Sequence, residues 1–247
     1  MPVPLTPVQV LQRAEGVWHS QQLPPYVQFT SRVQDQDDPV RIVVRTSDGA
    51  AYTKTIPQSP GEASFVAPGA HITGPYGAPL GFCISQVRCS GVLQADPFAT
   101  PPPAPADTGT KVIASAHAYA DPYDVTFGPL KQFQNHAVYD LVMHPHFDPK
   151  RYQLRGMLID SADFRIRQLT YEASQGRPGL VLRYDFGPVD DAWYLQFICV
   201  DFPAHRSPDE CSLESTNLWD FSLPAYVPDW YFDPAAYRQH TSTPQRD

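Results

Sequence analysis

Long apolar runs and clusters of basic residues are both missing from this 247-residue sequence. A membrane-spanning helix needs about 18 or more consecutive apolar residues. No such run occurs, so we expect no transmembrane segment. The 18 Lys and Arg residues are scattered singly, and the formal net charge is -8. Because nucleic-acid binding needs basic side chains that neutralise phosphates, nucleic acid is excluded as a partner.

Sequence motifs for catalysis are absent as well. The chain has no GxSxG turn, no HExxH zinc motif, no P-loop and no GxGxxG sequence after a strand. The acidic residues on candidate strands are Asp140, Asp160, Glu172, Asp185 and Asp201. Arginines lie near them in the sequence, at positions 155, 165, 167 and 183, which is more typical of cross-strand ion pairs than of an acid and base pair. We therefore assign no catalytic residue and no cofactor.

Histidines are the remaining candidates for metal chemistry. His136, His144 and His146 lie close together in the sequence. On a strand, His136 and His144 share a face but lie roughly 27 Å apart at about 3.4 Å per residue, and Pro145 ends the strand before His146. We expect no metal site. A metal-dependent hydrolase that uses these histidines with His117 and a strand carboxylate remains an alternative.

The four cysteines form two pairs that are close in sequence, Cys83 with Cys89 and Cys199 with Cys211. Neither spacing is the CxxC of zinc or redox sites, so we predict two local disulfides. Four buried free thiols are the alternative. Disulfides favour an exported protein, periplasmic or extracellular, although this chain begins without a signal peptide.

Proline is abundant, with 28 residues, and because each proline removes an amide donor and fixes φ, long helices are disfavoured. One short helix is nevertheless predicted at residues 5–22, where Thr6 can cap, Pro7 takes the first helical position and Gln9 completes a capping box. Residues 26–56 then alternate polar and apolar side chains. They contain a predicted hairpin around the Asp48-Gly49 turn.

The rest of the chain divides by composition. Residues 57–110 are rich in Gly and Pro and form a long excursion from the sheet. Strand patterns resume at regular spacing through residues 111–202, as in an antiparallel meander. Residues 203–247 are an aromatic-rich tail that should pack across the sheet. We predict a single domain, residues 1–247, of mainly β class, with an N-terminal helix and a long Gly/Pro-rich loop.

Four stretches carry a family resemblance: "PPYVQFTSRV", "VRIVVRTSDGAAYTKTI", "YDLVMHPHFDPKRYQLRGMLIDSADFRIRQLTYE" and "LVLRYDFGPVDDAWYLQFI". Over residues 26–56 and 111–202 the pattern resembles the bacterial outer-membrane lipoprotein carrier and sorting proteins. The resemblance implies a strongly curved antiparallel sheet, an incomplete barrel whose concave side holds acyl chains. The family's lid helices are not evident here, and no lipobox cysteine lies near residue 1.

The resemblance implies non-enzymatic binding or carriage of a hydrophobic ligand, a lipid or acyl chain, in the cell envelope. The expected lining residues are Phe29, Tyr139, Leu141, Met143, Leu158 and Leu182 from the strands, with Tyr76 and Phe82 from the long loop. An envelope scaffold that binds only other proteins is a further alternative.

Overall fold

The computed structural model describes residues 4–20, 24–33, 38–48, 50–56, 63–66, 97–98, 122–129, 131–146, 153–173, 179–190, 192–202, 211 and 214–242. The elements in chain order are α1 (Pro7–Ser20), β1 (Tyr26–Val33), β2 (Val40–Arg45), β3 (Ala51–Thr55), β4 (Ala63–Val66), β5 (Tyr123–Phe127), β6 (Lys131–Phe133), β7 (His136–Pro145), β8 (Leu154–Asp160), β9 (Ile166–Tyr171), β10 (Leu180–Val189), β11 (Ala192–Asp201), β12 (Glu214–Ser222), the 3-10 helix η3 (Asp229–Phe232) and α2 (Pro234–Ser242).

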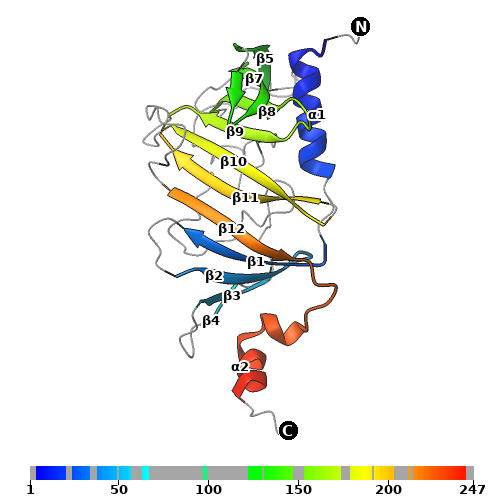
Figure 1. Cartoon of the computed structure of the whole chain (residues 1–247), viewed down its shortest axis with the longest axis vertical. Helices are drawn as coiled ribbons and strands as arrows, with labels where there is room; N and C mark the ends of the chain where they lie inside the picture. The colour runs from blue at the N-terminus through cyan, green and yellow to red at the C-terminus, as the bar shows by residue number, and fades with distance from the viewer. Residues whose placement is uncertain are drawn as a thin grey trace, which may run out of the picture. The chain divides into compact units, whose positions relative to one another are not determined.

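The strands form one antiparallel sheet that is not closed into a barrel. Its order is β4-β3-β2-β1-β12-β11-β10-β9-β8-β7-β5, and β6 also pairs with β7 (Figure 1). The predicted mainly β class and open antiparallel sheet are therefore confirmed. The meander predicted from residue 136 onward is present as β7 to β11, whereas the strand predicted at residues 111–120 lies outside the described residues.

The N-terminal helix begins as the capping box predicts. The Thr6 amide donates to the Gln9 side-chain oxygen at 2.9 Å, and the Gln9 amide donates to the Thr6 hydroxyl at 3.2 Å. These two hydrogen bonds satisfy amides that a helix start leaves without intrahelical partners. Val10 and Ala14, one helical turn apart, are fully buried. They mark the side of α1 that packs on the protein.

The hairpin between β2 and β3 is also confirmed. Its register pairs Val40 with Thr55 and Val44 with Ala51. At the turn, the Asp48 carboxylate accepts hydrogen bonds from the Ala50 amide and from the Arg45 guanidinium, both of which hold the loop closed. The sequence missed β5 and β6. The β6–β7 turn places Gln134 and Asn135 at positive φ, 47° and 67°, as a tight hairpin turn requires.

Contacts divide the chain into two compact units. The first comprises Met1–His19, Pro97–Tyr184 and Cys199–Leu213, and the second comprises Ser20–Asp96, Asp185–Ile198 and Glu214–Asp247. In the first unit, α1 contacts the turn between β8 and β9, where the Arg13 guanidinium carbon lies 5.1 Å from the Phe164 ring centre. The single-domain organisation of residues 1–247 stays a prediction.

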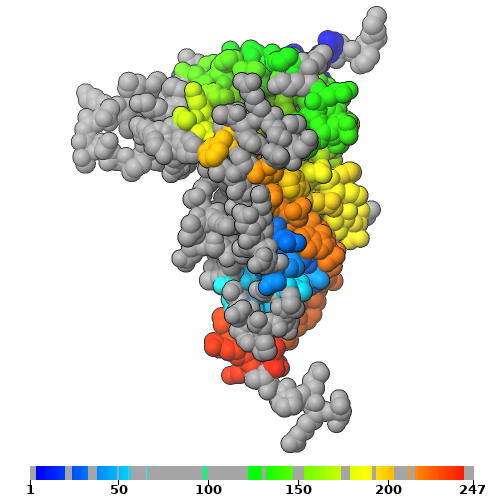
Figure 2. Space-filling model, turned by 60° about the vertical axis from the view of Figure 1, so that its left-hand side comes forward, coloured from blue at the N-terminus to red at the C-terminus, as the bar shows by residue number. Residues whose placement is uncertain are grey.

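The second unit contains the aromatic tail. Its first part is the strand β12, which pairs with β1 and was missed as a strand. Its last part, η3 and α2, packs on the sheet as predicted for the tail, because Val227 and Phe232 form one buried cluster with Val43 and Tyr52. The Tyr52 and Tyr237 hydroxyls lie 2.7 Å apart. In Figure 2 the red C-terminal segment lies next to cyan β4, in agreement with the packing of Phe65 against this cluster.

Candidate functional site

The first unit has a row of apolar side chains that crosses four strands. Leu141 on β7 pairs with Met157 on β8, Met157 pairs with Leu169 on β9, and Leu169 pairs with Leu182 on β10. Directly paired residues of antiparallel strands point to the same side of a sheet. Each of the four side chains is at most 1% exposed. We call the side that carries this row, together with Met143, the apolar face.

The opposite side of the same strands carries polar and charged side chains among apolar ones, and we call it the polar side. Asp140 pairs with Leu158, Leu158 with Gln168, and Gln168 with Arg183. Leu158, predicted as a lining residue, therefore lies with these polar side chains and not with Leu141. The structure brings together only part of the predicted lining set in this unit: Tyr139, Leu141, Met143 and Leu182.

Phe29 belongs to the second unit. It is 1% exposed and stacks on Phe221 with ring centroids 5.5 Å apart. Phe221 also contacts Tyr194 at 5.5 Å. Phe29 is thus part of that unit's aromatic core. The loop residues Tyr76 and Phe82 lie outside the described residues, so their predicted role stays a prediction.

An aromatic row leads from solvent to the apolar face. Phe127 on β5 pairs with Leu141 and stacks on Tyr139 at 6.0 Å, and Tyr139 stacks in turn on Phe164 at 6.1 Å. Phe127 is 44% exposed whereas Leu141 is fully buried. The guanidinium carbon of Arg13, on α1, lies 5.1 Å from the Phe164 ring centre. The apolar face therefore has a solvent-exposed rim, which we call the aromatic row: Phe127, Tyr139 and Phe164.

The charged residues of the polar side form buried ion pairs, as the sequence predicts for its strand carboxylates and arginines. Arg167 binds Asp160 at 2.9 Å and Arg183 binds Asp201 at 2.7 Å, with all four side chains at most 6% exposed. Burial raises the pKa of Asp160, but hydrogen bonds from the Ala162 amide and Arg167, and the charges of Arg167 and His136, lower it below the ordinary value. The lowered pKa keeps the Asp160 carboxylate ionised at neutral pH, so it suits a structural role better than proton transfer.

Two of the candidate histidines, His136 and His144, contact different groups. His136 contacts the Asp160 carboxylate at 2.8 Å, and His144 lies 3.4 Å from the Thr126 hydroxyl. Within the described ranges, no three His, Cys, Asp or Glu side chains are grouped as metal ligands, and His117 lies outside those ranges. No described helix is both long and apolar enough to cross a membrane.

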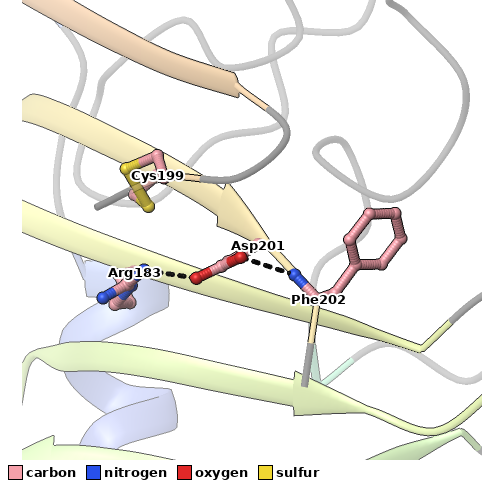
Figure 3. The surroundings of a disulfide bond; sticks show 5 residues. Arg183, Cys199, Asp201 and Phe202 are labelled. Atoms are coloured by element: carbon pink, nitrogen blue, oxygen red, sulfur yellow. Dashed lines mark hydrogen bonds and ion pairs between the residues drawn. A yellow bond between two sulfur atoms is a disulfide. The ribbon is translucent and has the colours of Figure 1, made fainter. Parts of the chain in front are cut away.

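One predicted disulfide is present. Cys199, near the end of β11, is bonded to Cys211, with Cα atoms 5.6 Å apart. Figure 3 shows it beside the Arg183–Asp201 pair, where Asp201 also accepts a hydrogen bond from the Phe202 amide at 2.8 Å. The bond joins β11 to residue 211 close to a buried charge pair. Cys83 and Cys89 lie outside the described residues.

The sequence reasoning missed Arg13, Phe127 and Phe164 as members of the site. Arg13 belongs to no sequence motif, and Phe127 lies in a strand that was not predicted. Phe164 follows a turn in which its backbone takes a positive φ of 60°. No periodic pattern marks a bulky residue in this left-handed conformation, so only the structure reveals the row.

Comparison with known proteins finds similarity to solved structures alone. No protein-family model matches the sequence, and no curated protein matches it. A LolA superfamily protein from Nitrosomonas europaea is 14% identical, with 94% of this chain and 99% of that chain covered and a TM-score of 0.38. A DUF1329 family protein from Desulfovibrio piger is 11% identical, with 94% and 99% covered and a TM-score of 0.39. A putative outer membrane lipoprotein-sorting protein domain from Vibrio parahaemolyticus is 9% identical, with 92% and 96% covered and a TM-score of 0.38. The names of the first and third proteins contain the terms LolA superfamily and outer membrane lipoprotein-sorting protein.

Proposed function

We propose that this chain is a non-enzymatic binding protein for a lipid or acyl-chain ligand, which it holds on the apolar face of its first unit. The observation that carries the proposal is the pairing of exposed Phe127 with buried Leu141. This pairing joins a solvent-exposed aromatic side chain to an apolar surface that runs across four strands without a charged residue in its row.

The apolar face is covered by the chain itself, since Leu141, Met143 and Leu182 are at most 2% exposed. A ligand must therefore replace apolar contacts that the chain makes with itself. An acyl chain suits such an exchange, because each buried CH₂ contributes about 0.8 kcal/mol and no polar group has to be left without a partner on this face. We expect the ligand to enter at Phe127, where the apolar surface reaches solvent.

The proposed location is the cell envelope, outside the cytosol. The Cys199–Cys211 disulfide supports it, because disulfides persist in oxidising compartments such as the periplasm. An envelope protein remains the expected partner if the apolar face binds a protein segment in place of a lipid.

The test is direct binding to the purified chain. A fluorescent fatty acid such as cis-parinaric acid is titrated into protein that has been stripped of lipid, and a separate sample is extracted with organic solvent for mass spectrometry. We expect saturable fluorescence enhancement or a co-purified lipid. Failure of the probe to bind, together with a lipid-free extract, would refute the carrier function and favour the envelope scaffold.

A charge at the rim provides the matched variant. Phe127→Asp places a carboxylate where the acyl chain enters. Contact with the acyl chain would desolvate this charge, and a desolvation cost of about 1.4 kcal/mol is enough to lower the affinity tenfold. We therefore expect the affinity for the probe to fall by about tenfold or more. Tyr226→Asp is the control, since Tyr226 is 72% exposed and belongs to the second unit. Equal loss of affinity in both variants would show that the probe does not enter at the aromatic row.

A further inference from the structure

Arg13 has an unusual environment for an arginine of this protein. Other arginines bind acidic side chains: Arg45 binds Asp48, Arg155 binds Glu172, and Arg165 binds Asp163. Arg13 is exposed and lies over the ring of Phe164. In the part of the chain that the structure describes, no carboxylate or carbonyl accepts a hydrogen bond from it.

The acidic residues of the turn that carries Phe164 have arginine partners of their own. Asp163, next to Phe164 in the sequence, pairs with Arg165, and Asp160 pairs with Arg167. Glu15 is two residues from Arg13 on α1, a spacing at which helical side chains do not face each other. The net charge of the chain is -8, yet no acidic residue within the described ranges pairs with the Arg13 cation at the end of the aromatic row.

The Arg13 guanidinium carbon lies 5.1 Å from the Phe164 ring centre, within the range of a cation–π contact. Such a contact uses none of the N–H donors of the guanidinium, which can bind a carboxylate or a phosphate in a bidentate manner. Any restriction of the arginine side chain by the ring before a ligand arrives reduces the entropy lost on binding.

Phe164 is itself fixed by its turn. The Phe164 amide donates to the Asp160 carbonyl at 3.0 Å, and the Asp160 amide donates to the Arg165 carbonyl at 2.8 Å. The Phe164 φ of 60° is a conformation that costs a bulky residue about 1–3 kcal/mol. Backbone strain of this kind is often found at ligand sites, and here the ring lies 5.1 Å from the Arg13 guanidinium carbon and 6.1 Å from the Tyr139 ring centre.

We infer that Arg13 is the headgroup site of the ligand, and that the ligand is an anionic amphiphile with a carboxylate or phosphate headgroup. The inference rests on the proposed function. The headgroup binds the N–H donors of Arg13 beside Phe164. The acyl chain runs along the aromatic row to Phe127 and onto the apolar face beside Leu141. Arg13 favours a negatively charged headgroup and the apolar face favours an acyl chain, so a ligand that has both binds best.

The experiment compares headgroups on one chain length. A neutral fluorescent probe, N-phenyl-1-naphthylamine, is bound to the full chain and displaced with hexadecanoate, hexadecyl phosphate or hexadecanol. We expect both anions to displace it at about tenfold lower concentration than the alcohol, as hydrogen bonds to a charged group imply. Inorganic phosphate and acetate should not displace it, because they lack the chain.

Arg13→Gln removes the charge and should abolish the preference for the anions while leaving displacement by hexadecanol unchanged. Arg13→Lys should retain part of the preference. Arg238→Gln is the matched control, since Arg238 is an exposed arginine on α2 in the second unit. Melting temperatures of all variants verify that they are folded.

The outcomes separate the two claims. If the probe and all three amphiphiles fail to bind, the proposed function itself is refuted. If they bind and the anions have no advantage, or if Arg13→Gln weakens the alcohol as much as the anions, the carrier function stands and the headgroup assignment to Arg13 is overturned. Displacement by inorganic phosphate alone would also overturn it, because the site would then bind free anions.

Discussion

At the scale of single residues, Asp160 shows how a buried carboxylate can be kept ionised. Its Oδ1 accepts the Ala162 amide at 2.9 Å, and its Oδ2 accepts two donors of Arg167 and lies 2.8 Å from His136. The pKa of Asp160 is lowered. A carboxyl whose pKa is lower in the folded state stabilises the fold fully above its unfolded pKa. That contribution is lost as the pH falls through the folded pKa.

We therefore expect the free energy of unfolding to decrease as the pH falls below the ordinary Asp pKa of 3.8. At pH 7, Asp160→Asn should destabilise the protein by about 3–5 kcal/mol, because it leaves Arg167 buried without a counter-charge. Urea unfolding at pH 7 and pH 3 measures both effects. Between pH 7 and pH 3, the free energy of unfolding should decrease less for Asp160→Asn than for the wild-type protein. Asp163→Asn is the control: its side chain is 29% exposed, so about 1 kcal/mol or less is expected. Equal losses in the two variants would contradict this account.

Gly128, the residue that follows β5, lies close to the side chain of Asp140 on β7. A Cβ added there would lie 2.6 Å from a carboxylate oxygen of Asp140 and 2.8 Å from its carboxyl carbon, and Asp140 is buried. Gly128→Ala should therefore destabilise the protein by about 1–3 kcal/mol, as overpacking usually does. In Gly156→Ala, the matched variant on β8, the new Cβ meets its nearest neighbour at 3.6 Å, and no such loss is expected. Thermal unfolding of Gly128→Ala and Gly156→Ala measures the difference in stability. Equal melting temperatures would show that the Asp140 side chain moves aside and would contradict the prediction.

At the scale of elements, α1 allows two substitutions with opposite expected signs. Thr6→Ala removes one half of the capping box and should cost about 1 kcal/mol. Gly16→Ala places a methyl group where no atom lies within 4 Å, and should stabilise the helix by about 0.5–1 kcal/mol because alanine loses less backbone entropy. Both changes are measured by denaturant unfolding. A destabilised Gly16→Ala would show that Gly16 faces something other than solvent.

Local sequence signals predicted the elements that depend on neighbouring residues and failed where the backbone departs from regular geometry. The capping box of α1 and the Asp48 turn were both visible in the sequence because each involves residues within a few positions. The strand β12 was not, since Asp220 takes a positive φ of 52° and the register with β1 shifts between Gln28 and Thr30. This bulge interrupts the two-residue alternation that identifies a strand.

The candidate site was predictable to the same limited extent. Alternation along β7 placed Leu141 and Met143 on one side, as the structure has them. The side on which Leu158 lies depends on the register between β7 and β8, which pairs it with Asp140 and which no single strand encodes. The contact between Arg13 and Phe164 joins residues 151 positions apart in the printed sequence and depends on tertiary packing. It could not be read from a local pattern.

At the scale of the whole molecule, the disulfides connect stability to location. Cys199 and Cys211 are 12 positions apart, and closing a loop of this length stabilises a fold by about 2–3 kcal/mol in the chain-entropy model. We expect a reductant to lower the melting temperature of the wild-type protein. The double variant Cys199→Ser/Cys211→Ser should lose most of that sensitivity, and any that remains would come from Cys83 and Cys89.

Thiol titration in denaturant without a reductant completes the test. If both predicted pairs are bonded, the wild-type chain has no reactive thiol, and two reactive thiols would mean that only one pair is bonded. Four reactive thiols in protein prepared under oxidising conditions would contradict the disulfide assignment. The proposal of an envelope location would then lose its support from disulfide chemistry. The proposal that an acyl chain binds on the apolar face would be unaffected, because the Phe127 and Arg13 variants test it independently of the disulfides.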